Sequence, residues 1–222
     1  MNSVPIVTID GPAASGKTSV SRELANRLGW QWVSTGAFYR GLAYVAQQLN
    51  IDFTDEGAIA RLVDNSEWEV RMDHEKTRVV LHGKDVTNEI NREEVGSLAS
   101  KISSFPKVRA ALLEAQRRCV KGVNGLVAEG RDCGTVVFPA ADVKFFLTAR
   151  SEDRAARRAQ EQGKTMEETH DLQKVRDAQD ANRKAAPMQA SSDSFTVDTS
   201  DLNFMEVVAK VEKEVRRQLN LA

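Results

Sequence analysis

Apolar residues along the chain occur in two patterns, short continuous runs and longer stretches with an apolar residue at every third or fourth position. A short run bounded by glycine or polar residues predicts a buried strand. The predicted strands are 4–9, 30–33, 126–128, 143–147 and 195–197. Pro5 lies near the beginning of the first run, where a strand tolerates it.

Four longer stretches carry the spacing of one helix face. Their apolar positions are Val20, Leu24 and Leu28, with Gly29 as a C-cap; Phe38, Leu42, Val45 and Leu49; Val108, Leu112, Ala115 and Cys119; and Phe204, Val207, Val208, Val211 and Val215. In this pattern Cys119 is a core thiol. Strands that alternate with helices and are apolar throughout are typical of a parallel sheet covered on both faces. We therefore expect an α/β fold with a doubly wound, five-stranded parallel sheet.

Two stretches do not follow this alternation of strands and helices. Residues 67–72 and 77–81 alternate, or nearly alternate, around a polar turn, which predicts a small antiparallel insertion. Residues 150–184 are dominated by charged side chains and predict weakly anchored helices, a mobile helical lid. We expect a core of 1–64 and 101–222, an insertion of 65–100, and a lid region of 150–184 within the core.

Composition narrows the range of functions. The 222 residues include 31 Lys+Arg and 32 Asp+Glu, so the chain lacks the basic excess of a nucleic-acid binder. Two cysteines without a CxxC pattern and three scattered histidines give neither a disulfide framework nor a zinc spacing. No apolar run approaches the roughly 20 residues of a membrane span, and the first apolar run stops at Asp10, unlike a signal peptide. We expect a cytoplasmic protein without nucleic-acid or membrane partners, and a monomer.

The clearest motif follows the first predicted strand and precedes the first predicted helix. It fits GxxxxGK[ST], and with the next residue it comprises Gly11, Pro12, Ala13, Ala14, Ser15, Gly16, Lys17, Thr18 and Ser19. In such a loop the backbone N–H groups and the helix N-terminus surround phosphates, the lysine binds the outer phosphates, and the hydroxyl of Thr18 ligates Mg²⁺. The motif predicts ATP or another nucleoside triphosphate as ligand. It does not distinguish a kinase from a GTP-dependent switch, although the N-K-x-D motif that reads guanine is absent.

Four further segments complete the pattern. They are Ser34 to Arg40, Ala99 to Arg109, Glu129 to Pro139 (EGRDCGTVVFP) and Arg176 to Pro187. In this order after a phosphate loop, the chain resembles the bacterial cytidylate kinases over almost its whole length, and the third segment is the most specific. The resemblance implies transfer of phosphate from ATP, with Mg²⁺, to CMP and dCMP. A kinase for another small acceptor and the nucleotide switch remain as alternatives.

The resemblance also implies roles for single residues. Around the acceptor nucleotide it places Thr35, Arg40, Arg131 and Arg183 along the phosphate and sugar, Ser100, Arg109 and Asp132 at the cytosine, and Arg176 and Asp180 at the ribose. A carboxylate that accepts from the cytosine amino group would reject uracil, which offers an acceptor there. Arginine forks suit phosphate oxygens.

Transfer between two nucleotides needs no general base, because the attacking oxygen belongs to an anionic phosphate. The site must supply alignment and positive charge, from Lys17, Arg131 and the lid arginines Arg154, Arg157 and Arg158. The plain alternative for the lid arginines is a solvated helix face with local ion pairs. Four positions depart from the family pattern. Glu129 replaces an aspartate suited to holding Mg²⁺ through water, Ala14 replaces a glycine, and Gln179 and Ala181 stand where relatives often have arginine.

Overall fold

The computed structural model describes residues 4–72, 75–163, 165, 170, 174–175, 177–180, 183 and 186–221. Its centre is a five-stranded parallel sheet, as the apolar runs predict, with the strand order β2-β6-β1-β7-β8. The strands are β1 (Ile6–Asp10), β2 (Gln31–Ser34), β6 (Leu126–Gly130), β7 (Val143–Thr148) and β8 (Phe195–Asp198). β1 occupies the middle of the sheet and is buried on both faces from Val7 to Asp10.

The first strand is shorter than its apolar run. Pro5 accepts a hydrogen bond from the amide of Leu126 (3.0 Å) but has no N–H to donate, so the ladder begins at Ile6. The amide of Ile6 donates instead to Oδ2 of Asp142 (2.8 Å). Pro5 therefore precedes the strand, and Ile6 is its first residue.

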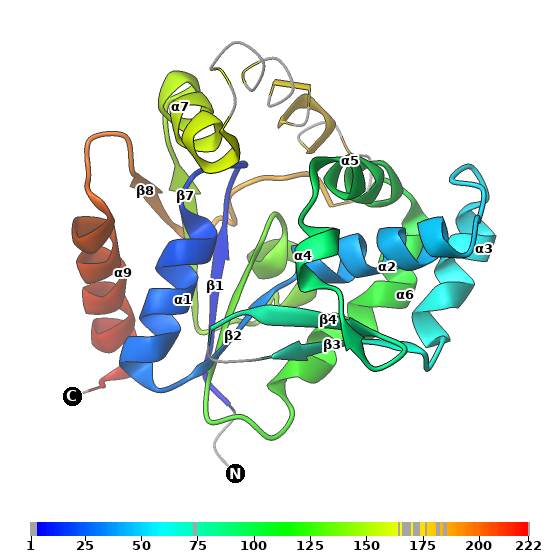
Figure 1. Ribbon diagram of the computed structural model, residues 1–222. Helices are drawn as coiled ribbons and strands as arrows, with labels where there is room; N and C mark the ends of the chain where they lie inside the picture. Colours follow the sequence, from blue (N-terminus) through cyan, green and yellow to red (C-terminus); the bar gives the residue numbers. More distant parts are fainter. Residues whose placement is uncertain are drawn as a thin grey trace.

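Helices cover both faces of the sheet (Figure 1). They are α1 (Lys17–Leu28) and α9 (Phe204–Leu219) on one side, and α2 (Gly36–Gln48), α3 (Glu56–Arg61) and α6 (Pro106–Arg117) on the other. On the α1 side, Val20 and Leu24 pack with Val208 and Val211 of α9 and with β1 and β7. Burial of these predicted apolar faces supplies the two halves of the core.

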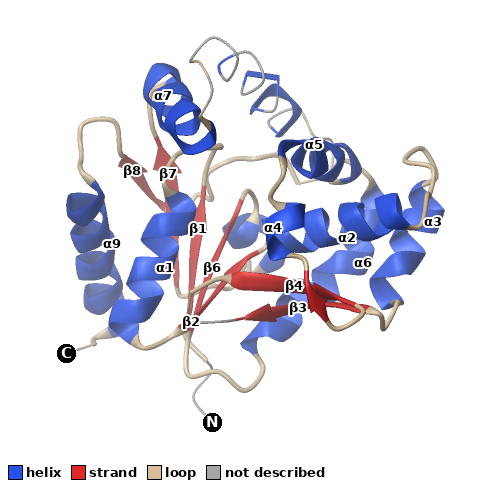
Figure 2. Cartoon of the chain, viewed as in Figure 1, coloured by secondary structure: helices blue, strands red, loops and turns tan. Residues whose placement is uncertain are grey.

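A small three-stranded antiparallel sheet lies below α2 and α4 in the view of Figure 2. It consists of β3 (Trp68–Met72), β4 (Thr77–Leu81) and β5 (Lys84–Asp85), followed by α4 (Thr87–Ile90) and α5 (Glu93–Ile102). The sequence predicts the first two strands. It misses β5, a two-residue exposed strand, and α5, whose buried face combines Val95 and Ile102 with the small residues Gly96 and Ala99.

Three residues assigned to the buried faces of predicted helices lie at helix ends instead and are partly or largely exposed. Leu49 follows α2 as its C-cap and is 46% exposed, and Phe204 begins α9 with 45% of its surface exposed. The predicted face that ends at Cys119 is interrupted because α6 stops at Arg117 and a short 3-10 turn follows. Cys119 is half-buried rather than a full core thiol. Residues at helix ends are displaced from the face because the terminal turns change pitch.

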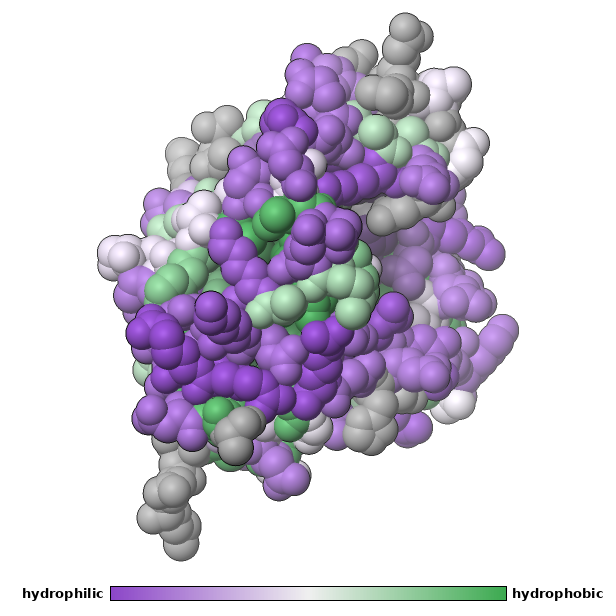
Figure 3. All heavy atoms as spheres, turned by 90° about the vertical axis from the view of Figure 1, so that its left-hand side faces the viewer, coloured by the Kyte–Doolittle hydropathy of each residue, from purple (hydrophilic) through white to green (hydrophobic). Residues whose placement is uncertain are grey.

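The charged stretch after β7 begins with α7 (Ser151–Gln162), which lies over the carboxyl ends of β1 and β7 (Figure 1). The face on the α9 side is mostly hydrophilic, with apolar residues in small patches (Figure 3). Within the described residues no helix combines the length and apolar character that a membrane crossing requires.

Candidate active site

The predicted phosphate loop follows β1, the strand at the centre of the sheet, and α1 begins at its lysine. Gly11 has φ +144°, and a Cβ atom there would lie 2.1 Å from the carbonyl oxygen of Leu147. Gly16, the N-cap of α1, has φ +86° and provides no side-chain cap to the helix. The first N–H groups of α1 are therefore left for an anionic ligand, the arrangement that binds phosphate in such loops.

Lys17 is buried and bends back over its own loop. Its Nζ donates to the carbonyl oxygen of Pro12 (2.6 Å) and lies 3.5 Å from Oγ of Ser15. Burial, and then the nearby charge of Arg131, lower the pKa of Lys17 to about 7. A lysine held in this way gains its full charge when a polyanion enters the loop.

Thr18 and Glu129 provide the oxygen atoms nearest to a metal position. Oγ1 of Thr18 donates to Oε1 of the buried Glu129, 3.2 Å away. The described residues contain no cluster of three or more His, Cys, Asp or Glu side chains that could hold a metal by themselves. Mg²⁺ bound to a nucleotide takes only one or two protein oxygens and fills its remaining positions with phosphate and water. The pair of oxygens fits such an ion, and the longer carboxylate at 129 still reaches Thr18.

Asp10 connects the phosphate loop with the segment after β6. Its two carboxylate oxygens accept from the backbone amides of Cys133 (2.8 Å) and Gly134 (2.7 Å). Burial raises the pKa of this carboxyl to about 6. These bonds hold the start of a π-helical turn, residues 133–137, that directly follows Arg131 and Asp132. Such turns occur mostly at functional sites.

Arg109 and Asp132 form a buried ion pair. Nη2 of Arg109 donates to Oδ2 of Asp132, Nη1 donates to the carbonyl oxygen of Ser103 (3.2 Å), and the guanidinium lies 5.7 Å from the centre of the Tyr39 ring. Asp132 lines the large cavity of the protein, whereas Arg109 is not among the residues that line it. Arg109 therefore holds the Asp132 carboxylate in place in this structure, and its contact with the cytosine stays a prediction.

A second charged group combines Arg131, Asp180 and Arg183. Nε of Arg131 donates to Oδ2 of Asp180 (2.8 Å), and Nη2 of Arg183 lies 3.9 Å from the other oxygen of the same carboxylate. Within the described part of the chain, Nη2 of Arg183 is buried and has no hydrogen-bond partner. Both arginines line the cavity and can offer N–H groups to a phosphate.

The three lid arginines of α7 lie in three different environments. Arg154 donates to the carbonyl oxygen of Ala13 (3.2 Å) in the phosphate loop and to Asp177 (2.6 Å), so it ties α7 to the loop. Arg157 donates to Oγ1 (3.0 Å) and the carbonyl oxygen (2.7 Å) of Thr199. Of the three, Arg158 alone lines the cavity. Sequence reasoning treated them as equivalent, and their tertiary contacts separate them.

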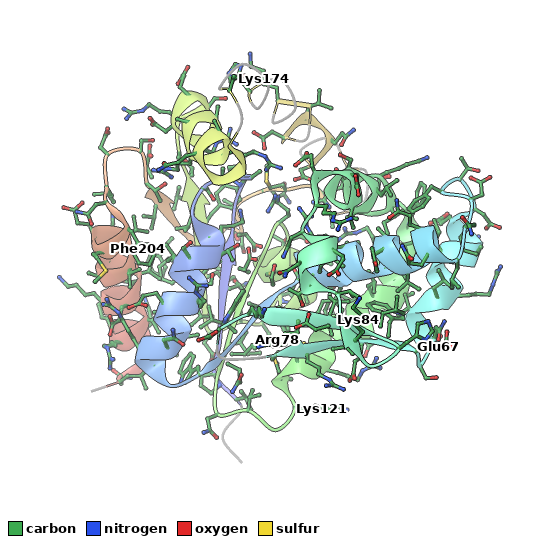
Figure 4. All side chains as sticks on the ribbon, in the orientation of Figure 1. Glu67, Arg78, Lys84, Lys121, Lys174 and Phe204 are labelled. Atoms are coloured by element: carbon green, nitrogen blue, oxygen red, sulfur yellow. The ribbon has the colours of Figure 1, made fainter. Side chains whose placement is uncertain are left out.

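All these elements surround one cavity of about 630 Å³. Figure 4 labels Lys174 at the top of the molecule and Arg78 on the small sheet. Predicted site residues that line the cavity are Ala13, Ala14, Lys17, Thr18, Thr35, Arg40, Ser100, Glu129, Arg131, Asp132, Arg158, Asp180 and Arg183. Arg176 lies outside the described residues. The loop positions Gly11, Pro12, Ser15, Gly16 and Ser19 shape the loop without lining the cavity.

Some cavity residues were not predicted. Tyr39 and Trp32 line it, and burial raises the pKa of the Tyr39 hydroxyl to about 12, so this hydroxyl stays protonated at neutral pH. Trp32 presents a buried Nε1 without a partner among the described residues. Trp32 belongs to a predicted buried strand, and a pattern of apolar residues does not show which side of such a residue borders a cavity.

A phosphate loop on the central strand, facing arginines across one cavity at the carboxyl ends of a parallel sheet, defines a P-loop nucleotide-binding α/β protein. The comparisons with known proteins are more specific. A sequence model of the cytidylate kinase family matches residues 7–217. The chain belongs to the cytidylate kinase family.

Relatives match along almost their full length. A cytidylate kinase of Bdellovibrio bacteriovorus is 58% identical over 214 residues, covering 96% of this chain and 99% of the relative. A cytidylate kinase of Aeromonas salmonicida is 42% identical over 220 residues, covering 97% and 95%. A solved structure of an uncharacterized protein from Eubacterium ventriosum is 11% identical, with a TM-score of 0.52 and coverage of 98% and 99%, a similarity of fold alone.

Proposed function

We propose that the protein transfers the terminal phosphoryl group of ATP to CMP or dCMP, giving ADP and CDP or dCDP. The observation that carries this proposal is the presence of Lys17 of the phosphate loop and the buried Asp132 carboxylate on one cavity. A nucleoside triphosphate and a base with an amino group can therefore bind in the same cavity. Membership in the cytidylate kinase family supports the same reaction.

In the proposed reaction an oxygen of the CMP phosphate attacks the terminal phosphorus of ATP, and the bond to the ADP oxygen breaks. The attacking oxygen is already anionic, so no side chain must remove a proton. The residues have to align the two phosphates and balance their charge. Lys17 and the N–H groups at the start of α1 face the donor phosphates, and Arg131 and Arg183 face the acceptor phosphate.

Thr18 and Glu129 would hold Mg²⁺, directly or through water. A bound Mg²⁺ would neutralise charge on the outer phosphates of ATP. Before the nucleotide arrives, the hydrogen bond between Thr18 and Glu129 keeps both oxygens at that position.

In the proposal, the carboxylate of Asp132 selects cytosine over uracil. Arg109 orients the Asp132 carboxylate through their ion pair, so the carboxylate can accept from the cytosine amino group. Uracil would place a carbonyl oxygen against it. Ser100, on the same cavity, is the second proposed contact to the base. Arg40 and Thr35, which also line the cavity, are the proposed contacts to the acceptor phosphate and sugar. Arg40 donates to the carbonyl oxygen of Ile90 (2.9 Å).

We extend the proposal to a monomeric enzyme. Both cysteines are free thiols, which suits the reducing cytoplasm. We also retain the division into a core, an insertion at 65–100 and a lid at 150–184 as a proposal.

The test is ADP formation from Mg-ATP with CMP, dCMP, UMP, AMP, GMP and shikimate offered separately at equal concentration. We expect turnover largely confined to CMP and dCMP. Turnover with another acceptor would keep the kinase but overturn the cytosine assignment. Slow hydrolysis that is the same with every acceptor would overturn the proposal.

A further inference from the structure

The lid region and the insertion meet at both ends of α5. Near its first turn, Nη2 of Arg158 donates to Oε2 of Glu93 (3.0 Å). Near its last turn, Oγ of Ser100 donates to Oε1 of Gln179 (3.0 Å). The two points are about 10 Å apart along the helix, at 1.5 Å per residue. One helix of the insertion thus contacts the lid above the acceptor side of the cavity.

Arg158 differs from its neighbours in how many of its donors are in use. Within the described residues, Glu93 is its one hydrogen-bond partner, whereas Arg154 and Arg157 are each bound to two or more groups. The Arg158 side chain is 13% exposed and lines the cavity. A guanidinium has five N–H donors, so one contact fixes its direction and leaves the others for a ligand.

We propose that Glu93 is a positioning residue for phosphoryl transfer, which holds the guanidinium of Arg158 above the reacting phosphates. This inference rests on the proposed function of the same site. The Glu93 side chain is 28% exposed, so the pair is partly screened from water and is charge-assisted. It fixes a long, flexible side chain before the substrates bind, and this saves the cost of ordering it later.

The same helix also sets the position of acceptor-side residues. A Cβ atom at Gly96 would lie 2.9 Å from both terminal nitrogens of Arg40, so α5 passes directly over that guanidinium. Ser100, one turn further, lines the cavity. Because Glu93 belongs to this helix, the lid arginine is aligned with the residues that hold the acceptor rather than with the phosphate loop alone.

The first experiment compares Glu93→Gln with the matched control Glu94→Gln. Both acids lie in the first turn of α5 and interact similarly with the helix dipole, but Glu94 is exposed and makes no hydrogen bond or ion pair with the described residues of the lid. We expect Glu93→Gln to lower kcat for CMP about 10-fold, with little change in the KM for CMP or in Tm, because the transfer arginine loses its alignment. Glu94→Gln should behave as the unmodified protein.

The second experiment tests whether Glu93 acts through Arg158. We expect Arg158→Ala to lower kcat by about 100-fold and Glu93→Gln to cause no further loss in that background. Glu93→Asp, which keeps the charge on a shorter stem, should restore part of the activity lost in Glu93→Gln. Equal losses from Glu93→Gln with and without Arg158, or equal kinetics of the Glu93→Gln and Glu94→Gln variants, would overturn the inference.

The two proposals fail in different ways. If the unmodified protein does not phosphorylate CMP, the proposed function fails and the role of Glu93 with it. If the unmodified protein is active and Glu93→Gln keeps full kcat, the role of Glu93 alone is wrong.

Discussion

The hydroxyl of Thr18 lies 3.2 Å from a carboxylate oxygen of Glu129, which joins the start of α1 to the neighbouring strand β6. Removing the negative charge while keeping the shape, in Glu129→Gln, should lower affinity for Mg²⁺ about 10- to 100-fold, the usual effect of losing an outer ligand. The measurement is ADP formation with CMP as a function of free Mg²⁺. Glu129→Asp is the control and should stay within a few-fold of the unmodified protein. A Mg²⁺ dependence unchanged in both variants would remove Glu129 from the metal position.

The buried pair of Arg109 and Asp132 determines which variant tests base recognition. Asp132→Ala would leave the buried Arg109 without its ion-pair partner, a change that typically costs about 3–5 kcal/mol of stability. Asp132→Asn keeps the shape and one acceptor oxygen, and we expect it to reduce the preference for CMP over UMP in kcat/KM about 10- to 100-fold. Tm, measured alongside, separates this effect from unfolding. Equal losses of kcat/KM on both acceptors would show that Asp132 is structural.

Lys17 predicts proton uptake when ATP binds. Its pKa is lowered to about 7 in the free protein, so at about pH 8 the amine is mostly neutral. Phosphate oxygens favour the charged form and raise this pKa, so binding should take up a substantial part of one proton at about pH 8 and much less at about pH 6. Titration calorimetry with Mg-ATP in two buffers of different ionisation enthalpy measures this. Lys17→Arg, which stays charged, should abolish the uptake, and persistence of the uptake there would assign it to another group.

Ala14 adopts a left-handed conformation, with φ +57°. For a residue with a Cβ atom this costs roughly 1–2 kcal/mol, whereas glycine accepts it freely but loses more entropy on folding. We expect Ala14→Gly to raise the free energy of unfolding by up to about 1 kcal/mol, as measured by urea denaturation. Ala13→Gly is the control. Ala13 lies outside the left-handed region, and its buried methyl group would be lost, so this change should destabilise. A loss of stability in both variants would contradict the account.

Local signals predicted the phosphate loop and the five parallel strands because both depend on neighbouring residues. The glycine spacing fixes the loop, and apolar runs such as 143–147 fix the strands. The insertion helix α5 was missed because Gly96 and Ala99 contribute to its buried face without the bulk of an apolar stripe. The sequence also could not separate Arg154, Arg157 and Arg158. Their different environments depend on Ala13, Thr199 and Glu93, which are distant along the chain. The ion pair of Arg109 with Asp132 is also a tertiary contact, which the local sequence pattern does not predict.

The pairing of Asp10 with Gly130 in the sheet has a mechanical consequence. The phosphate loop and Arg131 leave the sheet at the same level, from adjacent strands that are about 4.8 Å apart. The carboxylate of Asp10 also accepts hydrogen bonds from the amides of Cys133 and Gly134. The phosphate loop and the segment after β6 are therefore held in a fixed position relative to each other. In the proposed reaction, stiff β-structure would then set the spacing between the donor and acceptor phosphates. Exchanging the lid for an unrelated helical segment would alter charge and hydration above the phosphates and leave that spacing unchanged.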